Sequence, residues 1–334
     1  MAPPSPGAPV GVLLFNLGGP DTLDDVEPFL VRLFSDREII ELPGGPWLQP
    51  LFARLIARRR GPEVRHNYSR IGGGSPQLAI TRAQAAALEE RLTAAGADCR
   101  TFIAMRYWKP TTERALEEME SAGISRVVTL TLYPHYSCAT TGSSESELRR
   151  LLSTPRWRGR FQVSGIDAYP DEPLYLDALA DTVRRGLETW PADRRDRVVL
   201  LFSAHGLPQR FIERGDPYIE HTEATRRGIL DRLGVANRHR LAFQSRTGPV
   251  TWIGPGTDEA IAEMGAEGIT DVLVVPVSFV GDHIETLYEV DMLFGDQARA
   301  AGITTYRRTE ALNTHPLFID ALAALVTRHL QARG

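Results

Sequence analysis

Short apolar runs alternate along this chain with longer segments of helical periodicity. The clearest run spans 272–279, where valine dominates and polar residues are almost absent. A run without polar alternation is typical of a strand that is buried on both faces of a parallel sheet. We expect further strands at 10–15, 100–105, 126–132, 161–164, 197–202, 241–244 and 304–306, and helices at 24–34, 77–95, 111–122, 173–189, 218–233, 258–267 and 316–330. The alternation predicts an α/β fold of parallel sheets flanked by helices.

Two parts of this pattern occur twice, in the same order. The segment Thr112–Met119 is matched by Thr257–Met264, and Val12–Phe15 recurs as Val199–Phe202. We therefore expect two similar α/β halves that face each other across a cleft. The expected ranges are 10–165 for the first half, completed by the C-terminal segment 307–334, and 166–306 for the second half.

The segment 46–60 predicts a helix of unusual composition. Large apolar residues cover about half of its circumference, and three arginines close it. These apolar residues are Trp47, Leu48, Leu51, Phe52, Leu55 and Ile56. Two interpretations are open: a helix that packs into a core, or an apolar lid or membrane-surface element.

A row of acidic residues begins just after the apolar run 272–279. At about 100° per residue, Asp282, Glu285 and Glu289 fall on one side of a helix. Because the row follows the C-terminal end of a buried strand, it lies where open α/β sheets bind their ligands. Asp282 and Glu285 also have the spacing of a capping box, so helix capping is the alternative to a metal site.

His205 follows another predicted buried strand, on a turn bounded by Gly206 and Pro208. A single histidine in such a place is more often structural than functional. However, a parallel sheet brings the ends of its strands to one edge, so His205 and the acidic row are expected to lie together. One imidazole and several carboxylates would offer an open ligand shell to a divalent first-row metal.

Bulk composition narrows the range of functions. The net charge of −4 disfavours a protein that binds nucleic acid through its overall charge, so we expect no nucleic-acid partner. Residues 1–9 lack the basic and apolar regions of a signal peptide, and we find no apolar run of about 18 residues. Two cysteines, Cys99 and Cys138, are expected to be reduced thiols and are too few for a four-thiolate cluster.

Seven motifs together resemble one enzyme family, the ferrochelatases, which insert Fe²⁺ into a porphyrin to make haem. They run from residue 10 to about 320 and so cover nearly the whole chain. The motifs are Asn16-Leu17-Gly18-Gly19-Pro20, Ile71-Gly72-Gly73-Gly74-Ser75-Pro76, Arg106-Tyr107, Tyr136-Ser137-Cys138, Ser203-Ala204-His205-Gly206-Leu207-Pro208, Gln244-Ser245-Arg246-Thr247-Gly248-Pro249 and Asp282-His283-Ile284-Glu285-Thr286-Leu287-Tyr288-Glu289.

The resemblance implies two Rossmann-like halves with a porphyrin between them, and it implies roles for individual residues. His205 and Glu285 match the inner, catalytic metal-binding pair. Asp282, His283 and Glu289 match a polar path that leads to this pair. The porphyrin-contacting positions are matched by Leu17, Arg60, Tyr68, Ser75, Arg106 and Tyr107. The segment 46–60 matches the apolar lip of the family, which favours the lid interpretation.

Three departures from the family pattern refine these expectations. Leu17 stands where coproporphyrin-using relatives carry a tyrosine, so we expect protoporphyrin IX as the substrate. Cys138 matches one ligand of the [2Fe–2S] cluster that some ferrochelatases carry, but no cysteine-bearing tail follows, so we expect no cluster. Gly206 replaces the usual serine after the histidine, a change that a turn tolerates.

The resemblance thus predicts a protoporphyrin ferrochelatase, the last enzyme of haem biosynthesis, without a permanently bound cofactor. Fe²⁺ and protoporphyrin IX are the expected substrates and haem the product. The expected location is the cytoplasm, with residues 46–60 in peripheral contact with the inner face of the membrane. The alternatives are a related chelatase for Co²⁺ or Ni²⁺ and a non-enzymatic haem or metal carrier.

Overall fold

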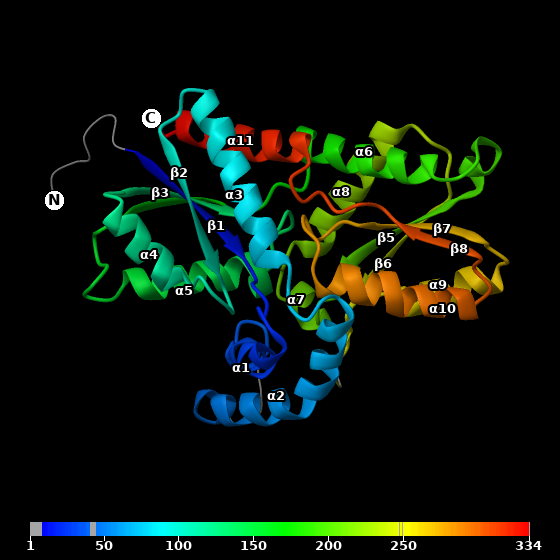
Figure 1. The fold of residues 1–334 in the computed structure, drawn as a ribbon, viewed down its shortest axis with the longest axis horizontal. Coiled ribbons are helices and arrows are strands. Elements are labelled where there is room, and N and C mark those ends of the chain that lie inside the picture. Colours follow the sequence, from blue (N-terminus) through cyan, green and yellow to red (C-terminus); the bar gives the residue numbers. More distant parts are fainter. Residues whose placement is uncertain (1–8, 41–44, 247, 249, 334) are drawn as a thin grey trace. The chain divides into compact units, whose positions relative to one another are not determined.

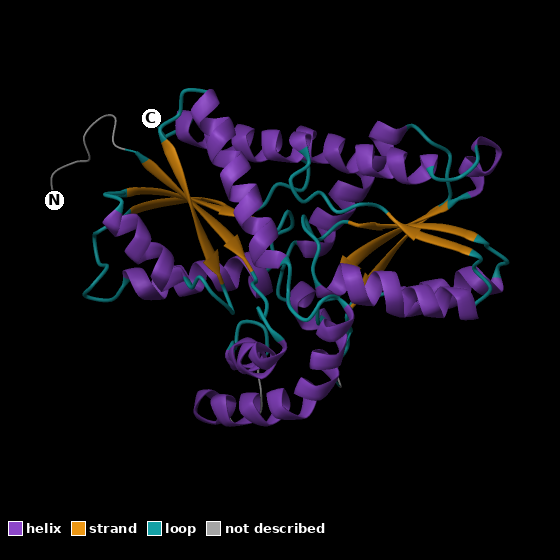
Figure 2. Cartoon of the chain, viewed as in Figure 1, coloured by secondary structure: helices purple, strands orange, loops and turns teal. Residues whose placement is uncertain are grey.

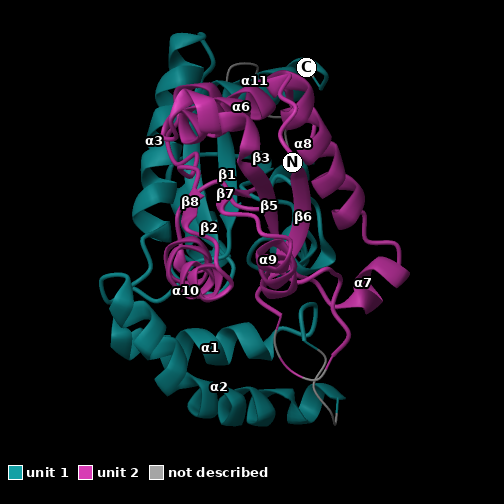
Figure 3. Ribbon diagram, turned by 90° about the vertical axis from the view of Figure 1, so that its right-hand side faces the viewer, with its two compact units in different colours: residues 1–169, 319–334 teal, residues 170–318 magenta. Residues whose placement is uncertain are grey.

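The computed structural model describes residues 9–40, 45–246, 248 and 250–333. Residues 1–8, and Thr247 and Pro249 of the sixth motif, lie outside the described residues. The chain forms two compact units, residues 1–169 with 319–334 (unit 1) and residues 170–318 (unit 2), which Figure 3 shows in different colours. As functional domains, the ranges 10–165 with 307–334 and 166–306 stay predictions.

Each unit is a four-stranded parallel sheet with helices on both faces (Figure 2). The prediction of two similar α/β halves is therefore confirmed. In unit 1 the strands lie in the order β2-β1-β3-β4. Their bounds are β1 (Val10–Asn16), β2 (Cys99–Met105), β3 (Arg126–Thr131) and β4 (Gln162–Ile166).

The helices of unit 1 cover both faces of its sheet (Figure 1). One face carries α4 (Thr112–Ser121) and α5 (Ser143–Leu152), and the other carries α3 (Gln77–Ala94) and α11 (Pro316–Gln331), which enters unit 1 at Ile319. The unit also contains η1 (Leu23–Asp25), α1 (Val26–Ser35), α2 (Gly45–Arg70) and the π-helix η2 (Cys138–Gly142). Because both faces are covered, Val12, Leu13 and Leu14 of the central strand have no exposed surface.

Unit 2 repeats this plan, with the strand order β6-β5-β7-β8. Its strands are β5 (Val199–His205), β6 (His239–Gln244), β7 (Asp271–Pro276) and β8 (Thr305–Arg308). In Figure 1, α6 (Pro173–Glu188) and α8 (Tyr218–Leu233) cover one face, and α9 (Thr257–Ala266) and α10 (Gly295–Ala300) the other. The remaining elements are η3 (Ala192–Arg197), α7 (Gln209–Glu213) and the π-helix η4 (Glu285–Phe294).

The internal repeat in the sequence corresponds to equivalent elements. Strands β1 and β5, which share the Val-Leu-Leu-Phe pattern, each lie second in their sheet. Helix α4 follows β2 as α9 follows β6, and Met119 and Met264 of these helices occupy the two hydrophobic cores. In both units the third strand is followed by a π-helix, η2 after β3 and η4 after β7.

Helix α2 extends the predicted segment 46–60 to Arg70 and exposes four of its six large apolar residues, while Phe52 and Ile56 are half-buried. The small residues Ala53, Ala57 and Gly61 of this helix are buried. Trp47 is 92% exposed and Leu51 61%, so the interpretation of these side chains as core packing is wrong. Leu48 and Leu55 are exposed as well. In the part of the chain that the structure describes, no helix combines the length and the apolar character needed to cross a bilayer.

Candidate functional site

The polar residues of unit 2 that the sequence singled out lie after the C-terminal ends of its strands. His205 is the last residue of β5, Gln244 is the last residue of β6, and Glu285 begins η4 after β7. The three strands are parallel neighbours, so their carboxyl ends meet at one edge of the sheet.

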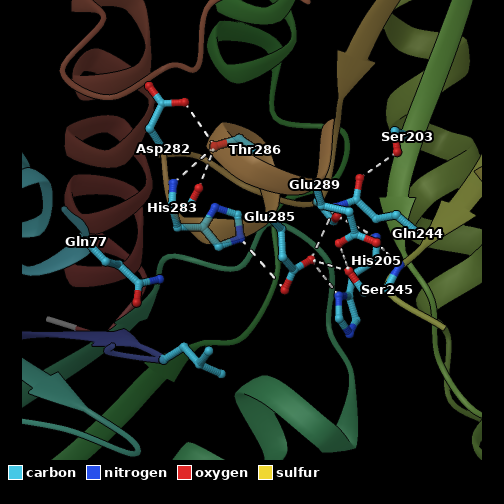
Figure 4. A network of polar contacts seen from close by, with 12 residues as sticks. Gln77, Ser203, His205, Gln244, Ser245, Asp282, His283, Glu285, Thr286 and Glu289 are labelled. Atoms are coloured by element: carbon cyan, nitrogen blue, oxygen red, sulfur yellow. Dashed lines mark hydrogen bonds and ion pairs between the residues drawn. The ribbon is translucent and has the colours of Figure 1, made fainter. Parts of the chain in front are cut away.

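At this edge His205 and Glu285 are in direct contact. The Nδ1 atom of His205 lies 2.8 Å from Oε2 of Glu285. Figure 4 shows the two side chains pointing toward each other. The same Oε2 accepts a hydrogen bond from Nε2 of Gln244 at 3.3 Å and from Oγ of Ser245 at 3.0 Å. The side chains of His205 and Glu285 are 35% and 18% exposed, so solvent reaches both. The prediction that the fold brings these two residues together is confirmed.

Ser245 joins the two glutamates of η4. Its backbone N–H donates to Oε1 of Glu289 at 2.8 Å, and its hydroxyl reaches both Glu285 and Glu289. Ser245 has a positive φ of 63°, an uncommon conformation for a residue other than glycine, which aims N–H and O–H at the same helix. The sequence placed Ser245 in a motif but assigned it no role. Its position directly after the end of a predicted strand could have marked it as a site residue.

Burial and the charges of neighbouring groups together shift the pKa values of His205, Glu285 and Glu289. Burial opposes the charge on Glu285, but the adjacent His205 outweighs it and lowers the Glu285 pKa to about 2. Burial also acts against the charged form of His205, yet the carboxylates of Glu285 and Glu289 prevail and raise the His205 pKa above its usual value. Burial and the charge of Glu285 raise the pKa of Glu289 to about 7. At neutral pH Glu285 is thus ionised beside His205, and Glu289 is near its titration point.

His283 is buried beside this pair. Its ring lies against the ring of Phe279, with 4.0 Å between the centroids, and its Nε2 is 3.9 Å from Oε1 of Glu285. Neither ring nitrogen has a hydrogen-bond partner among the described residues. Burial lowers the pKa of His283, so its imidazole is neutral at pH 7.

Asp282 does not join the two glutamates, contrary to the predicted row. Its carboxylate accepts hydrogen bonds from Thr286 and Asn313 and pairs with Arg308, and in Figure 4 it points toward Thr286. The row assumed that all three residues lie on one helix, but Asp282 precedes the helix, which begins at Glu285 and is a π-helix. The capping-box alternative is also wrong, since the Asp282 N–H donates to Asn313 instead of Glu285.

Unit 1 brings together two of the predicted porphyrin-contacting residues at the end of β1. A Cβ atom on Gly19 would lie 2.5 Å from Oγ of Ser75 and 3.4 Å from the hydroxyl of Tyr68, so glycine is required for this approach. Leu17 precedes it and is half-buried. The guanidinium of Arg60 lies on α2, 6.0 Å from the centroid of the Phe34 ring.

Arg106 and Tyr107 converge on a residue that the sequence did not indicate, Asp36. Its Oδ2 accepts from Nη2 of Arg106 at 2.8 Å, from the hydroxyl of Tyr107 at 2.6 Å and from Oγ of Ser143 at 2.5 Å. Tyr107 is 1% exposed and therefore lies inside unit 1, whereas the Arg106 side chain keeps 18% exposure. The partners are more than 35 positions apart in sequence, so local pattern gave no signal for this network.

Within the described residues, no three His, Cys, Asp or Glu side chains are grouped as a metal site. The cluster instead offers a cation one imidazole and one carboxylate in contact, with a second carboxylate on the same helix. Such a set leaves coordination positions open, as suits a metal that must be passed on.

Comparisons with known proteins agree with this geometry. The family model for ferrochelatase matches residues 9–330. A ferrochelatase of Geotalea uraniireducens (strain Rf4) is 53% identical over 315 residues, which cover 94% of this chain and 96% of the relative. A ferrochelatase of Synechocystis sp. is 49% identical over 318 residues, covering 95% of this chain and 81% of the relative.

Among solved structures, SirB from Bacillus subtilis with Fe³⁺ aligns over 96% of this chain and 95% of its own. The TM-score is 0.55 at 13% identity, so this likeness shows the chelatase-like fold alone. The family model and the relatives of about half identity go further, because they span nearly the whole sequence. The chain belongs to the ferrochelatase family, enzymes of haem biosynthesis that insert Fe²⁺ into protoporphyrin.

Proposed function

We propose that this chain inserts Fe²⁺ into protoporphyrin IX with His205 and Glu285 as the inner site. The observation that carries the proposal is the 2.8 Å contact between Nδ1 of His205 and Oε2 of Glu285. The reaction exchanges two pyrrole N–H protons of the porphyrin for one Fe²⁺, so the site must accept protons and hold a dehydrated cation. An imidazole supported by carboxylates supplies groups for both tasks.

The steps are divided among the residues by their charge. Glu285, whose pKa is about 2, stays ionised and holds Fe²⁺ as an oxygen ligand. In its neutral form, His205 takes a pyrrole proton and Glu285 stabilises the imidazolium that results. Glu289, whose pKa is about 7, receives protons and releases them near neutral pH. His283 is the neutral second imidazole on this path, and Asp282 anchors the segment that carries it.

The residues of unit 1 are proposed to bind the porphyrin. The Tyr68 and Ser75 hydroxyls each lie beside Gly19, and Arg60 and Arg106 supply positive charge for the propionates. Tyr107 is inside the unit, so we assign it to holding Asp36 and Arg106 in place. Leu17 offers an apolar, half-buried surface without a hydrogen-bond donor, which favours the vinyl groups of protoporphyrin IX over additional propionates.

Two further proposals concern cofactors and location. The chain works without an iron–sulfur cluster, because its 334 residues contain two cysteines and such clusters are held by four thiolates. We place the enzyme in the cytoplasm with α2 against the membrane surface. The exposed Trp47, Leu51 and Leu55 supply the apolar contact, and Arg58 and Arg59 beside them supply attraction to anionic lipid.

The deciding experiment is anaerobic Fe²⁺ insertion, assayed side by side on protoporphyrin IX and coproporphyrin III. We expect haem formation with the first porphyrin at a higher kcat/KM. A preference for coproporphyrin III would overturn the argument from Leu17. Faster insertion of Co²⁺ or Ni²⁺ into another tetrapyrrole would favour the related chelatase. Haem held by a stable axial ligand without turnover would favour a carrier.

A further inference from the structure

The π-helix η4 places the two glutamates of the site, and its geometry needs outside support. Glu285 is its first residue and Glu289 lies within its first turn. π-helices are usually confined to a single turn, often at functional sites, because their hydrogen-bond geometry is less favourable than that of an α-helix. Here the π-helix runs for 10 residues, and its N-cap residue, Ile284, supplies no side-chain cap.

One residue outside η4, Arg308, binds a residue before Glu285 and a residue after Glu289. Arg308 is the last residue of β8, where it pairs with Val274 of β7. Its Nε and Nη2 bind the two carboxylate oxygens of Asp291 at 2.7 and 2.9 Å, a bidentate pair. Its Nη1 lies 3.1 Å from Oδ1 of Asp282. The Arg308 side chain is 12% exposed, so these contacts are largely shielded from water.

The two partners of Arg308 enclose the catalytic part of the helix. Asp282 lies three residues before Glu285, just outside the helix, and Asp291 lies two residues after Glu289. Asp282 is itself fixed by Asn313, whose side-chain oxygen accepts from the Asp282 N–H at 3.0 Å and whose Nδ2 donates to its carboxylate at 3.1 Å. The ends of the glutamate-bearing stretch are thus tied to one guanidinium on a sheet strand.

We propose that Arg308 is a positioning residue for iron insertion, which holds η4 so that Glu285 meets His205. The inference rests on the proposed function of that pair. Arg308 contacts neither residue of the pair, so it acts through the helix and not on the iron or the porphyrin. In this proposal Asp282 holds the segment before η4 in place and does not bind the metal.

Arg308→Lys is the sharpest test. Lysine keeps the positive charge but has a single ammonium group, which cannot bind Asp291 through two nitrogens and reach Asp282 as well. The neighbouring Arg307 provides a matched control. Its Nη1 donates to the Thr189 carbonyl and its guanidinium lies over Trp190, so Arg307→Lys changes the same strand without touching η4.

We expect Arg308→Lys to lower kcat for Fe²⁺ insertion about tenfold or more with KM for the porphyrin nearly unchanged, because displaced catalytic groups lower rate more than binding. Amide hydrogen exchange in 285–294 should accelerate, and Arg307→Lys should change neither quantity. Guanidinium ion should restore part of the activity of Arg308→Ala. Asp291→Asn, which weakens the bidentate pair with Arg308, should give a smaller loss of kcat. It is the replacement variant if Arg308→Lys does not fold.

Unchanged kcat in folded Arg308→Lys would overturn the inference, and so would an equal loss in Arg307→Lys. A loss of kcat without faster exchange in 285–294 would also overturn it, since the helix would then not be the route. The proposed function fails separately, if the wild-type protein in the same assay forms no haem. In that case the exchange measurement still decides whether Arg308 holds η4.

Discussion

Nδ1 of His205 and Oε2 of Glu285 lie 2.8 Å apart, although 80 positions separate the two residues in the chain. The parallel neighbours β5 and β7 bring them to one edge of the sheet, and the widened helix η4 directs Glu285 back toward the imidazole.

The first prediction ranks the residues of this cluster. We expect His205→Ala to abolish insertion while porphyrin binding stays largely intact, because the proton acceptor is lost but the groups of unit 1 remain. Glu285→Gln should lower kcat more than Glu289→Gln, because Glu285 contacts His205 directly, whereas Glu289 is linked to Glu285 through the hydroxyl of Ser245. Anaerobic kinetics with a porphyrin-binding titration measures both. Near-normal turnover of His205→Ala, or the reverse order of the glutamates, would contradict the assignment.

A second prediction separates the hydroxyl of Ser245 from its backbone. Both Ser245→Gly and Ser245→Ala remove the hydroxyl and keep the backbone N–H. Glycine adopts the positive φ of 63° without strain, whereas alanine does not. Both should lower kcat. Thermal unfolding should show Ser245→Ala to be the less stable variant by about 1 kcal/mol, the usual cost of a left-handed non-glycine residue. Equal activity of Ser245→Gly and wild type would show that the hydroxyl is dispensable.

The third prediction concerns pH and a carboxyl pair in unit 1. Burial and the nearby Asp167 raise the pKa of Glu145 to about 7. For an acid, a folded-state pKa above the unfolded value means stability that is complete below about pH 4.5 and lost as pH rises through about 7. The shift corresponds to about 3 kcal/mol, and solvent at this partly exposed pair should reduce it to about 1–2 kcal/mol.

Glu145→Gln removes that titration. The variant should therefore gain stability relative to wild type as pH rises from about 5 to 8. Denaturant unfolding at several pH values measures the difference, with Glu147→Gln on the same helix as the control, since Glu147 pairs with Arg150 at the surface. A difference that does not change with pH would contradict the raised pKa.

A fourth prediction tests α2 as a membrane contact. Leu51→Ser combined with Leu55→Ser should reduce co-sedimentation with vesicles of anionic phospholipid, because both side chains are more than 60% exposed. Val235→Ser, which changes an exposed apolar residue of unit 2, is the control and should leave sedimentation unchanged. Binding that survives in the double variant would place the membrane contact elsewhere.

Much of this architecture could be predicted from local pattern. Apart from α2, which runs ten residues beyond the predicted segment 46–60, the predicted strands and helices appear within a few residues of their positions. A buried parallel strand leaves an unbroken apolar run in the sequence. The repeat Thr112–Met119 and Thr257–Met264 gave the two-unit plan without any long-range information. The pairing of His205 with the acidic segment followed from a rule about sheets alone.

What failed depended on geometry that local pattern does not carry. The sequence pattern predicts a helix that includes Asp282, but the helix begins only at Glu285, as a π-helix, so Asp282 lies outside the predicted row. Asp36 gave no signal because its partners Arg106 and Ser143 come from segments far along the chain. Ser245 acts partly through its backbone, which a side-chain motif cannot reveal.

The π-helices that follow the third strand in each unit bear on how the chain acquired its chemistry. The spacing that relates Thr112 to Thr257 also relates the first residues of β3 and β7, and it places Thr140 opposite Glu285 and Ser144 opposite Glu289. The widened turn is therefore a feature that the two units share. The carboxylates occur in unit 2 alone, and unit 1 has hydroxyl groups, those of Thr140 and Ser144, at the equivalent positions, so the two units share a backbone but differ in the charge that it carries.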